Sequence, residues 1–300
     1  MNFKKRNGRN STTNNVVFWL MWFILVLYCL SIIGVVYWMV TASFKSYFEY
    51  TLRPYQFPQY FRWENYSDVF KYLYVKVTRG GQKVELGFFD LLGSSFLYSL
   101  LMPIPSLFWT VCFAYGISTF RRYWYNNFLY NLGILLMVVP LVGSLPISMR
   151  VAKLIGIYDN MPRAWLLSGG SFSGMRFLML YGIFKNVSPT YREACLIDGG
   201  NNYTAFFRLS IPLVFPSIVC FYFLDFIAWW NNYETFLIWY PSYANLGYGM
   251  YVFQNNINLY GVGYPVVLAG FVLVSIPAII LYIVINQGLT KNLTFGGLKG

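Results

Sequence analysis

The chain has 300 residues, of which 57% are hydrophobic, 22% aromatic and only 11% charged. This composition is that of an integral membrane protein, because a single soluble domain of this length would not need so little charge. Histidine is absent, which removes the commonest proton relay and general base. The net charge of +12 favours basic residues that orient membrane helices over a nucleic-acid surface, because no soluble segment gathers them.

The apolar segments predict an all-α integral membrane protein with six transmembrane helices and both termini in the cytoplasm. Residues 1–15 carry basic residues and no acid, which predicts a cytoplasmic tail. Residues 16–40 form a continuous apolar run, long enough for the about 20 residues that cross a bilayer. A cleaved signal peptide is the competing interpretation, but the run is longer than an ordinary signal core, which favours a retained first helix. Residues 41–90 are polar and aromatic, and we place them outside.

Residues 91–287 are predicted to hold the other five transmembrane helices, and residues 288–300 form a second cytoplasmic tail. The predicted helices cover about 91–119, 128–149, 164–184, 212–231 and 265–286. Prolines within them predict kinks or breaks at Pro103, Pro105, Pro140, Pro146 and Pro277. Segment 168–174 is rich in Ser and Gly, which lets neighbouring helices approach closely.

A polar loop at 185–211 separates the fourth and fifth predicted helices, and it must face water because charges at bilayer depth are costly. Its pattern predicts two short helices. Ser188 can cap the first helix, with Pro189 at its first position, and Gly199 with Gly200 ends it. Asn201 or Asn202 can then cap the second helix.

One face of the first short helix carries Tyr191, Ala194, Cys195 and Asp198 at helical spacing. Small side chains on an exposed helix permit close approach by another protein. We interpret the loop as a docking element for a soluble partner, and the rest of the chain as a membrane pathway that this element controls.

The loop resembles the EAA loop of ABC importer permeases, whose pattern is roughly E-A-A-x-x-D-G, with a later I-x-x-P. The matching residues are Glu193, Ala194, Asp198, Gly199 and Pro212. Three positions depart from the pattern, where Cys195 and Gly200 replace alanines and Leu209 replaces isoleucine. The replacements are small or similar in size, so close docking should survive.

Further segments narrow the resemblance to the carbohydrate-type permeases. Residues 131–160 look like their third-span segment, and residues 226–240 look like their fifth-span exit with its Trp-Asn pair, here Trp230-Asn231. Residues 293–300 are similar to the tail of the smaller maltose-type permease subunit. Together these matches cover about residues 90–300.

The resemblance implies a bacterial cytoplasmic-membrane importer for a sugar or oligosaccharide, built from this chain and a second permease subunit. Two ATPase subunits would bind ATP and Mg²⁺, and an extracytoplasmic solute-binding protein would deliver the solute. This chain would hold no cofactor, metal or catalytic residue, and it lacks the GxxxxGK[ST] phosphate loop. The residues implied in ATPase docking are Glu193, Ala194, Cys195, Asp198, Gly199, Leu209 and Pro212.

Two charged residues, Arg176 and Asp225, fall within predicted transmembrane helices, and such residues are functional candidates. They can form a structural ion pair or line the polar pathway. Trp230, Asn231 and Glu234 lie where the pathway should meet its outer mouth, and aromatic faces with nearby amides suit sugar rings. An interfacial aromatic belt is the alternative for Trp230.

Three other functions compete with the importer. A secondary transporter would need an ion-coupling site at the membrane midplane, and the spans hold only one acid. A channel subunit does not explain the docking loop. A membrane-embedded enzyme would need a nucleophile with a base, or metal ligands, and neither converges here. The secondary transporter or channel subunit for a polar solute therefore remains the alternative.

Overall fold

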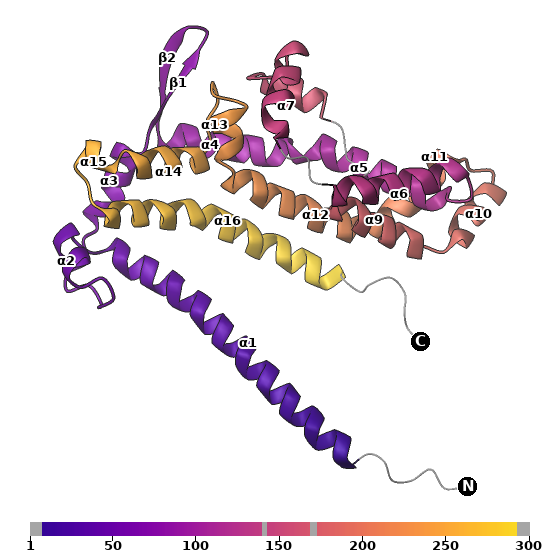
Figure 1. Ribbon diagram of the computed structural model, residues 1–300, viewed down its shortest axis with the longest axis horizontal. Helices are drawn as coiled ribbons and strands as arrows, with labels where there is room; N and C mark the ends of the chain where they lie inside the picture. Colours follow the sequence, from indigo (N-terminus) through magenta and orange to yellow (C-terminus); the bar gives the residue numbers. More distant parts are fainter. Residues whose placement is uncertain (1–7, 140–142, 169–172, 293–300) are drawn as a thin grey trace. The chain divides into compact units, whose positions relative to one another are not determined.

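The computed structural model describes residues 8–139, 143–168 and 173–292. The fold is mostly helical and divides into two compact units (Figure 1). The first unit comprises Met1–Tyr72 and Asn256–Leu273, and the second comprises Leu73–Asn255 and Val274–Gly300.

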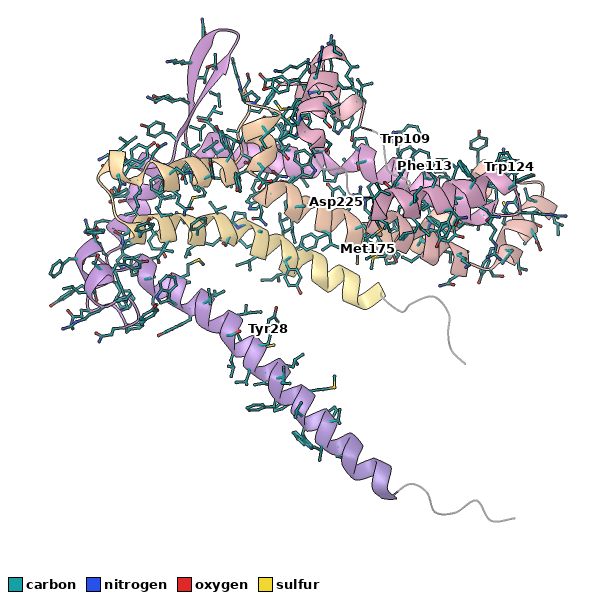
Figure 2. All side chains as sticks on the ribbon, viewed as in Figure 1. Tyr28, Trp109, Phe113, Trp124, Met175 and Asp225 are labelled. Carbon is teal, nitrogen blue, oxygen red and sulfur yellow. The ribbon has the colours of Figure 1, made fainter. Side chains whose placement is uncertain are left out.

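Helix α1 (Gly8–Ser43) dominates the first unit, and its segment Asn15–Ser43 is long and apolar enough to cross a membrane. Its large apolar side chains are exposed all around the helix, as at Tyr28, which is 64% exposed (Figure 2). A helix that is apolar on every side is stable only when lipid or another apolar surface covers it. Its sequence and its exposure both indicate a membrane-embedded helix.

The first unit also contains α2 (Tyr47–Leu52), α3 (Glu64–Tyr72), α15 (Ile257–Tyr260) and the start of α16 (Tyr264–Asn292). Lys45, just after α1, is completely buried. Its ammonium group donates to the carbonyl oxygens of Arg53 and Pro54 at 2.8 and 2.9 Å. Burial lowers the pKa of Lys45, and the nearby Glu49 carboxylate opposes that shift. The buried ammonium therefore fastens the loop after α2 to the end of α1.

A two-stranded antiparallel hairpin opens the second unit, so the prediction of an all-α fold was wrong at this point. Strand β1 (Val75–Arg79) pairs with β2 (Gln82–Leu86), with Val77 opposite Val84. Gly80 and Gly81 both have positive φ, as a two-residue hairpin turn requires. The alternation in VKVTRGGQKVEL, with Gly-Gly at its centre, was the signal for it.

The helical core of the second unit packs α5 (Pro103–Thr119) against α9 (Met175–Asn186) and α12 (Ile211–Asn231). α4 (Phe88–Leu101) precedes α5, and the junction falls at Pro103, as the sequence predicts. The buried side chains of this core come mainly from α5 and α9, and they are Leu107, Val111, Ala114, Tyr115, Ile117, Phe177, Leu180, Tyr181, Phe184, Phe206 and Val214.

Two predicted transmembrane helices are shorter in the structure than in the sequence-based prediction. Residues 128–149 divide into α6 (Trp124–Val138) and α7 (Ser144–Leu154), and Pro146 lies inside the first turn of α7. Pro140, the other predicted break, lies outside the described residues. Residues 164–184 divide into the end of α8 (Met161–Leu166) and α9, because Gly174 has a backbone conformation outside the helical region. Residues 169–172 of the predicted Ser- and Gly-rich segment also lie outside the described part.

Among the described residues, four helical segments are long and apolar enough to span a membrane, namely Asn15–Ser43, Phe88–Thr119, Asn202–Asn231 and Tyr264–Val284. The last of these contains Pro277 within α16. Within the second unit, α10 (Pro189–Ile197) and α11 (Asn202–Thr204) lie at one end, and the hairpin lies towards the other (Figure 1). The polar loop and the hairpin are thus separated along the transmembrane helices.

Candidate functional site

The polar loop folds as two short helices, which confirms the predicted pattern. The Ser188 hydroxyl accepts from the Thr190 N–H, and Pro189 occupies the first position of α10. The helix ends at Ile197, after which Gly199 has a φ of +82° that favours glycine. The Asn201 side chain then accepts from the Thr204 N–H at 2.8 Å and caps the second helix.

The second helix continues into α12 through a wide π-helical turn at Ala205–Ser210. The Ile211 N–H bonds back to the carbonyl of Phe206, five residues earlier. Pro212 explains the widening, because a proline ring would clash with the carbonyl four residues before it in a regular α-helix. Leu209 lies within the π-helical turn, so two residues of the EAA-like pattern form the junction between the loop and α12.

Arg192 fastens α10 to the rest of the second unit. Its guanidinium donates two hydrogen bonds to the Asn202 side-chain oxygen, at 3.1 and 2.8 Å. The same group lies over the ring of Phe120, 5.0 Å from its centroid. Asn202 begins α11 and Phe120 follows α5, so one cation joins three segments. Arg192 is not among the residues that the EAA-like pattern indicates, so its role becomes visible only in the structure.

The outer surface of α10 is open, since none of its residues is buried. Glu193, Ala194 and Asp198 are exposed, and so are apolar side chains around them, including Tyr191 and Ile197, which is 84% exposed. Exposed apolar side chains beside small and charged residues are typical of a protein-binding surface.

Cys195 and Gly200 are in tight contact across the turn that ends α10. The Gly200 N–H donates to the Cys195 carbonyl at 2.8 Å. A Cβ atom at position 200 would lie 2.6 Å from the Cys195 sulfur and 2.8 Å from its carbonyl oxygen. Two departures from the EAA pattern therefore face each other, and the cysteine occupies space that an alanine at 200 would need.

Arg176 and Asp225 form an ion pair between α9 and α12, so the structure brings together the two charges predicted within transmembrane helices. The other end of the guanidinium donates to the Ser106 hydroxyl of α5 at 3.1 Å. The side chains are 28% and 24% exposed. Asp225 lies in the middle of the helical core (Figure 2). A shared polar contact thus connects all three core helices. Nothing in the sequence marked Ser106 for this role except that it is a hydroxyl in an apolar helix.

Trp230 is 1% exposed, and its indole N–H donates to the carbonyl of Val274 at 3.3 Å. The ring packs edge-on against Phe96 at 5.0 Å between centroids. Asn231 and Glu234, which follow it, are exposed. The structure therefore separates the predicted outer-mouth residues, with the tryptophan inside the core and the two polar residues on the surface.

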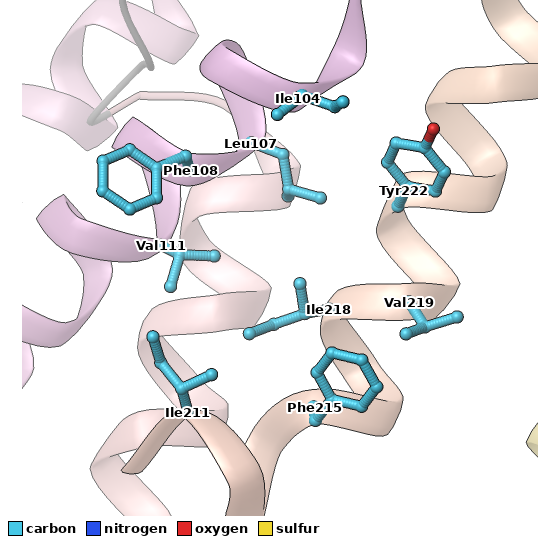
Figure 3. A pocket seen from close by; sticks show the side chains of 9 residues that line it. All are labelled: Ile104, Leu107, Phe108, Val111, Ile211, Phe215, Ile218, Val219 and Tyr222. Carbon is cyan, nitrogen blue, oxygen red and sulfur yellow. The ribbon is translucent and has the colours of Figure 1, made fainter. Parts of the chain in front are cut away.

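An apolar cavity of about 380 Å³ lies between α5 and α12, close to the π-helical turn (Figure 3). Ile104, Leu107, Phe108 and Val111 line it from α5, and Ile211, Phe215, Ile218, Val219 and Tyr222 line it from α12. The Tyr222 hydroxyl donates to the Leu100 carbonyl at 2.7 Å. The cavity offers almost no polar contact, so it suits an apolar side chain or acyl chain.

Comparison with known proteins supports the resemblance. No protein-family profile matches the chain. The chain is 23% identical over 92% of its length to the diacetylchitobiose uptake system permease protein NgcG of Streptomyces coelicolor, covering 87% of that protein. It is 25% identical over 87% of its length to the inner membrane ABC transporter permease protein YcjP of Escherichia coli, covering 89% of it. A solved bacterial ABC transporter for import of the acidic polysaccharide alginate matches with a TM-score of 0.66 and 21% identity, covering 96% of this chain and 99% of that one.

The fold is similar to that of the solved ABC importer, and the described residues include four helical segments long and apolar enough to cross a membrane. Over most of its length the chain is similar to ABC transporter permease proteins, and it is a multi-pass protein of the cytoplasmic membrane.

Proposed function

We propose that this chain forms half of the transmembrane pathway of an ATP-driven importer for a sugar or an oligosaccharide. The names of its relatives support a carbohydrate, since they include permease proteins for diacetylchitobiose and for galactooligosaccharides. A second permease subunit, two ATPase subunits that bind ATP and Mg²⁺, and an extracytoplasmic solute-binding protein would complete the importer. The chain itself would hydrolyse nothing.

The proposed topology has six crossings with both termini in the cytoplasm. The four long apolar helices would supply four crossings. The segments at 128–149 and 164–184 would supply the other two as broken helices, which membrane proteins tolerate where other helices cover them. Residues 41–90, with the hairpin, would lie outside. The loop at 185–211 would lie in the cytoplasm, which fits its position at the opposite end of the second unit from the hairpin.

The single observation that carries the mechanism is the exposed helix α10 held by Arg192 to both α5 and α11. Closure of the ATPase pair would move α10, and the attachments at Phe120 and Asn202 would pass that motion to the transmembrane helices. Glu193 and Asp198 would bond the ATPase, and Ala194 with Cys195 would allow close approach. Alternating access to the two sides of the membrane would follow.

The test is ATPase activity of the co-purified complex in lipid, with Glu193→Ala and Gly199→Pro beside the wild type. Both variants should insert normally but lose solute-stimulated hydrolysis or the bound ATPase subunit. Glu64→Ala is the matched control, because that carboxylate is exposed on α3 in the first unit and is not part of the loop. Normal transport by both variants, with no ATPase bound to the wild type, would favour the secondary transporter or channel instead.

A further inference from the structure

The first unit contains a polar cleft of about 260 Å³ that the proposed mechanism does not use. Two segments far apart in the sequence form it. Residues of α2, α3 and the loop between them line one part, and the turn between α15 and α16 lines the other. The lining residues are Tyr47, Arg62, Asn65, Asp68, Tyr72, Tyr260, Gly261, Val262, Gly263, Pro265 and Val266.

Asp68 is the least satisfied group in this cleft. Its side chain is half-buried, and it makes no hydrogen bond or ion pair within the described residues. The guanidinium of Arg62 approaches a carboxylate only at Glu64, 4.0 Å away and mostly in solvent. A carboxylate and a guanidinium that line one cleft without a strong partner retain their capacity to bind a polar ligand.

Other residues hold the walls of the cleft in place before any ligand binds. Asn65 is 2% exposed, and its amide donates to the carbonyls of Ser43 and Lys45 at 2.7 and 2.8 Å, which fixes the start of α3. A Cβ atom at Gly263 would lie 2.6 Å from the Tyr47 ring, so the glycine lets that ring lie against the backbone. A pocket with fixed walls costs little reorganisation on binding.

The combination of groups selects the class of ligand. A free phosphate would be repelled by Asp68, and a metal ion would need more than one carboxylate. Among the described residues no cluster of three or more His, Cys, Asp or Glu side chains could hold a metal. Hydroxyl groups of a sugar both donate and accept hydrogen bonds, so they match a carboxylate beside a guanidinium, and tyrosine rings match the sugar's apolar face. The volume is below the about 300–1,000 Å³ of pockets for drug-sized ligands, which fits one sugar ring.

We propose that this cleft is a binding site for a single sugar ring, with Asp68 and Arg62 bonding vicinal hydroxyls. The choice of a sugar over other polyhydroxylated ligands rests on the proposed import function. On the proposed topology the cleft opens outside the membrane, where it would hold one unit of the arriving carbohydrate before it enters the pathway.

Saturation-transfer NMR and calorimetric titration of the full chain in lipid nanodiscs test this site. The probes are the methyl glycosides of glucose, galactose, N-acetylglucosamine and galacturonate. At least one should bind, and Asp68→Asn and Arg62→Gln should each weaken binding about tenfold or more, as expected for the loss of a charged hydrogen bond. Gly263→Ala should also weaken it, because it displaces Tyr47 without changing any charge. Ser67→Ala, at an exposed side chain on the same helix that does not line the cleft, should leave it unchanged.

Binding of none of the four probes with a Kd below about 10 mM would overturn the proposal, as would equal binding by the Asp68 variant. A cleft that receives a basic side chain of a partner protein would give the first of these results. Uptake and ATPase assays separate the two hypotheses. If the protein takes up sugar in an ATP-dependent way but binds none in the cleft, the proposed cleft site is wrong and the proposed import function is supported. If sugar binds in the cleft but uptake is not coupled to ATP hydrolysis, the cleft site is supported and the proposed import function is wrong.

Discussion

The ion pair between Arg176 and Asp225 gives the sharpest prediction about stability. Replacing Asp225 with Asn should leave the guanidinium with only its 3.1 Å bond to Ser106 and a neutral amide. Breaking a fully buried pair costs about 3–5 kcal/mol. Because both side chains are about one-quarter exposed, we expect a smaller cost, about 2–3 kcal/mol.

The double variant Arg176→Met/Asp225→Leu should recover most of this loss and lie within about 1 kcal/mol of the wild type, because no unpaired charge remains. Thermal unfolding in nanodiscs of the wild type, Arg176→Met, Asp225→Leu and the double variant measures all four corners of the cycle. Arg150→Met is the control, since Arg150 is exposed. Additive effects of the two single changes would refute the idea that the charges stabilise each other.

Transport by the double variant separates the two roles that the sequence left open for this pair. If the pair serves only to join α5, α9 and α12, a stable double variant should import at a rate near that of the wild type. If the charges also line the pathway, the double variant should be stable but slow, with ATPase activity no longer coupled to uptake.

Three further substitutions test other parts of the structure. Gly200→Ala should clash with the Cys195 sulfur and carbonyl oxygen and reduce ATPase binding. Adding Cys195→Ala removes the sulfur and should restore part of the binding, and pull-down of the ATPase subunit reports both effects. Lys45→Met should destabilise the first unit by about 2–4 kcal/mol, because two carbonyls lose a charged donor. Because the pKa of Lys45 is lowered in the folded state, the unfolded chain binds more protons than the folded chain between that pKa and about 10.4. The free energy of unfolding of the wild type should therefore rise with pH in this interval. The rise should be absent in the Lys45→Met variant. Ser242→Ala should loosen the hairpin, because the Ser242 hydroxyl bonds both the Thr78 carbonyl and Asp159, and limited proteolysis should then cut between β1 and β2 faster.

The loop was predictable because its signals are local. Ser188, Pro189 and Gly199 act on the backbone within one turn of themselves, so their roles follow from the sequence alone. The π-helical turn could not be predicted in the same way. Pro212 indicates a disturbed helix, but the conformation that absorbs the disturbance depends on packing around Phe206 and Ser210, which are buried.

The contacts between distant segments could not be predicted from the sequence, for a different reason. The spacing of Arg176 and Asp225 limits their depth in the membrane, but not the rotation of each helix about its own axis. Trp230 is an example. Its position near the end of α12 was consistent with the mouth of the pathway, but the rotation of α12 about its axis places the side chain in the protein interior. The hairpin is the opposite case, because alternating residues around Gly80-Gly81 were a local signal that the aromatic and charged composition of 41–90 obscured.

The loop and the ion pair act on the same helices. Arg192 contacts Phe120 at the end of α5, and Ser106, which completes the ion pair, lies 14 residues earlier (120 − 106), or about 21 Å along a regular helix. The same arginine holds Asn202, from which an unbroken helical path leads through the π-helical turn to Asp225. A displacement of α10 would therefore reach the ion pair by two routes, through α5 and through α12. We expect these two helices to move together only while the pair is intact. Breaking the pair with Asp225→Asn, which leaves an unpaired guanidinium between the helices, should for this reason uncouple hydrolysis from uptake while the ATPase subunit stays bound, whereas changes in α10 should release that subunit.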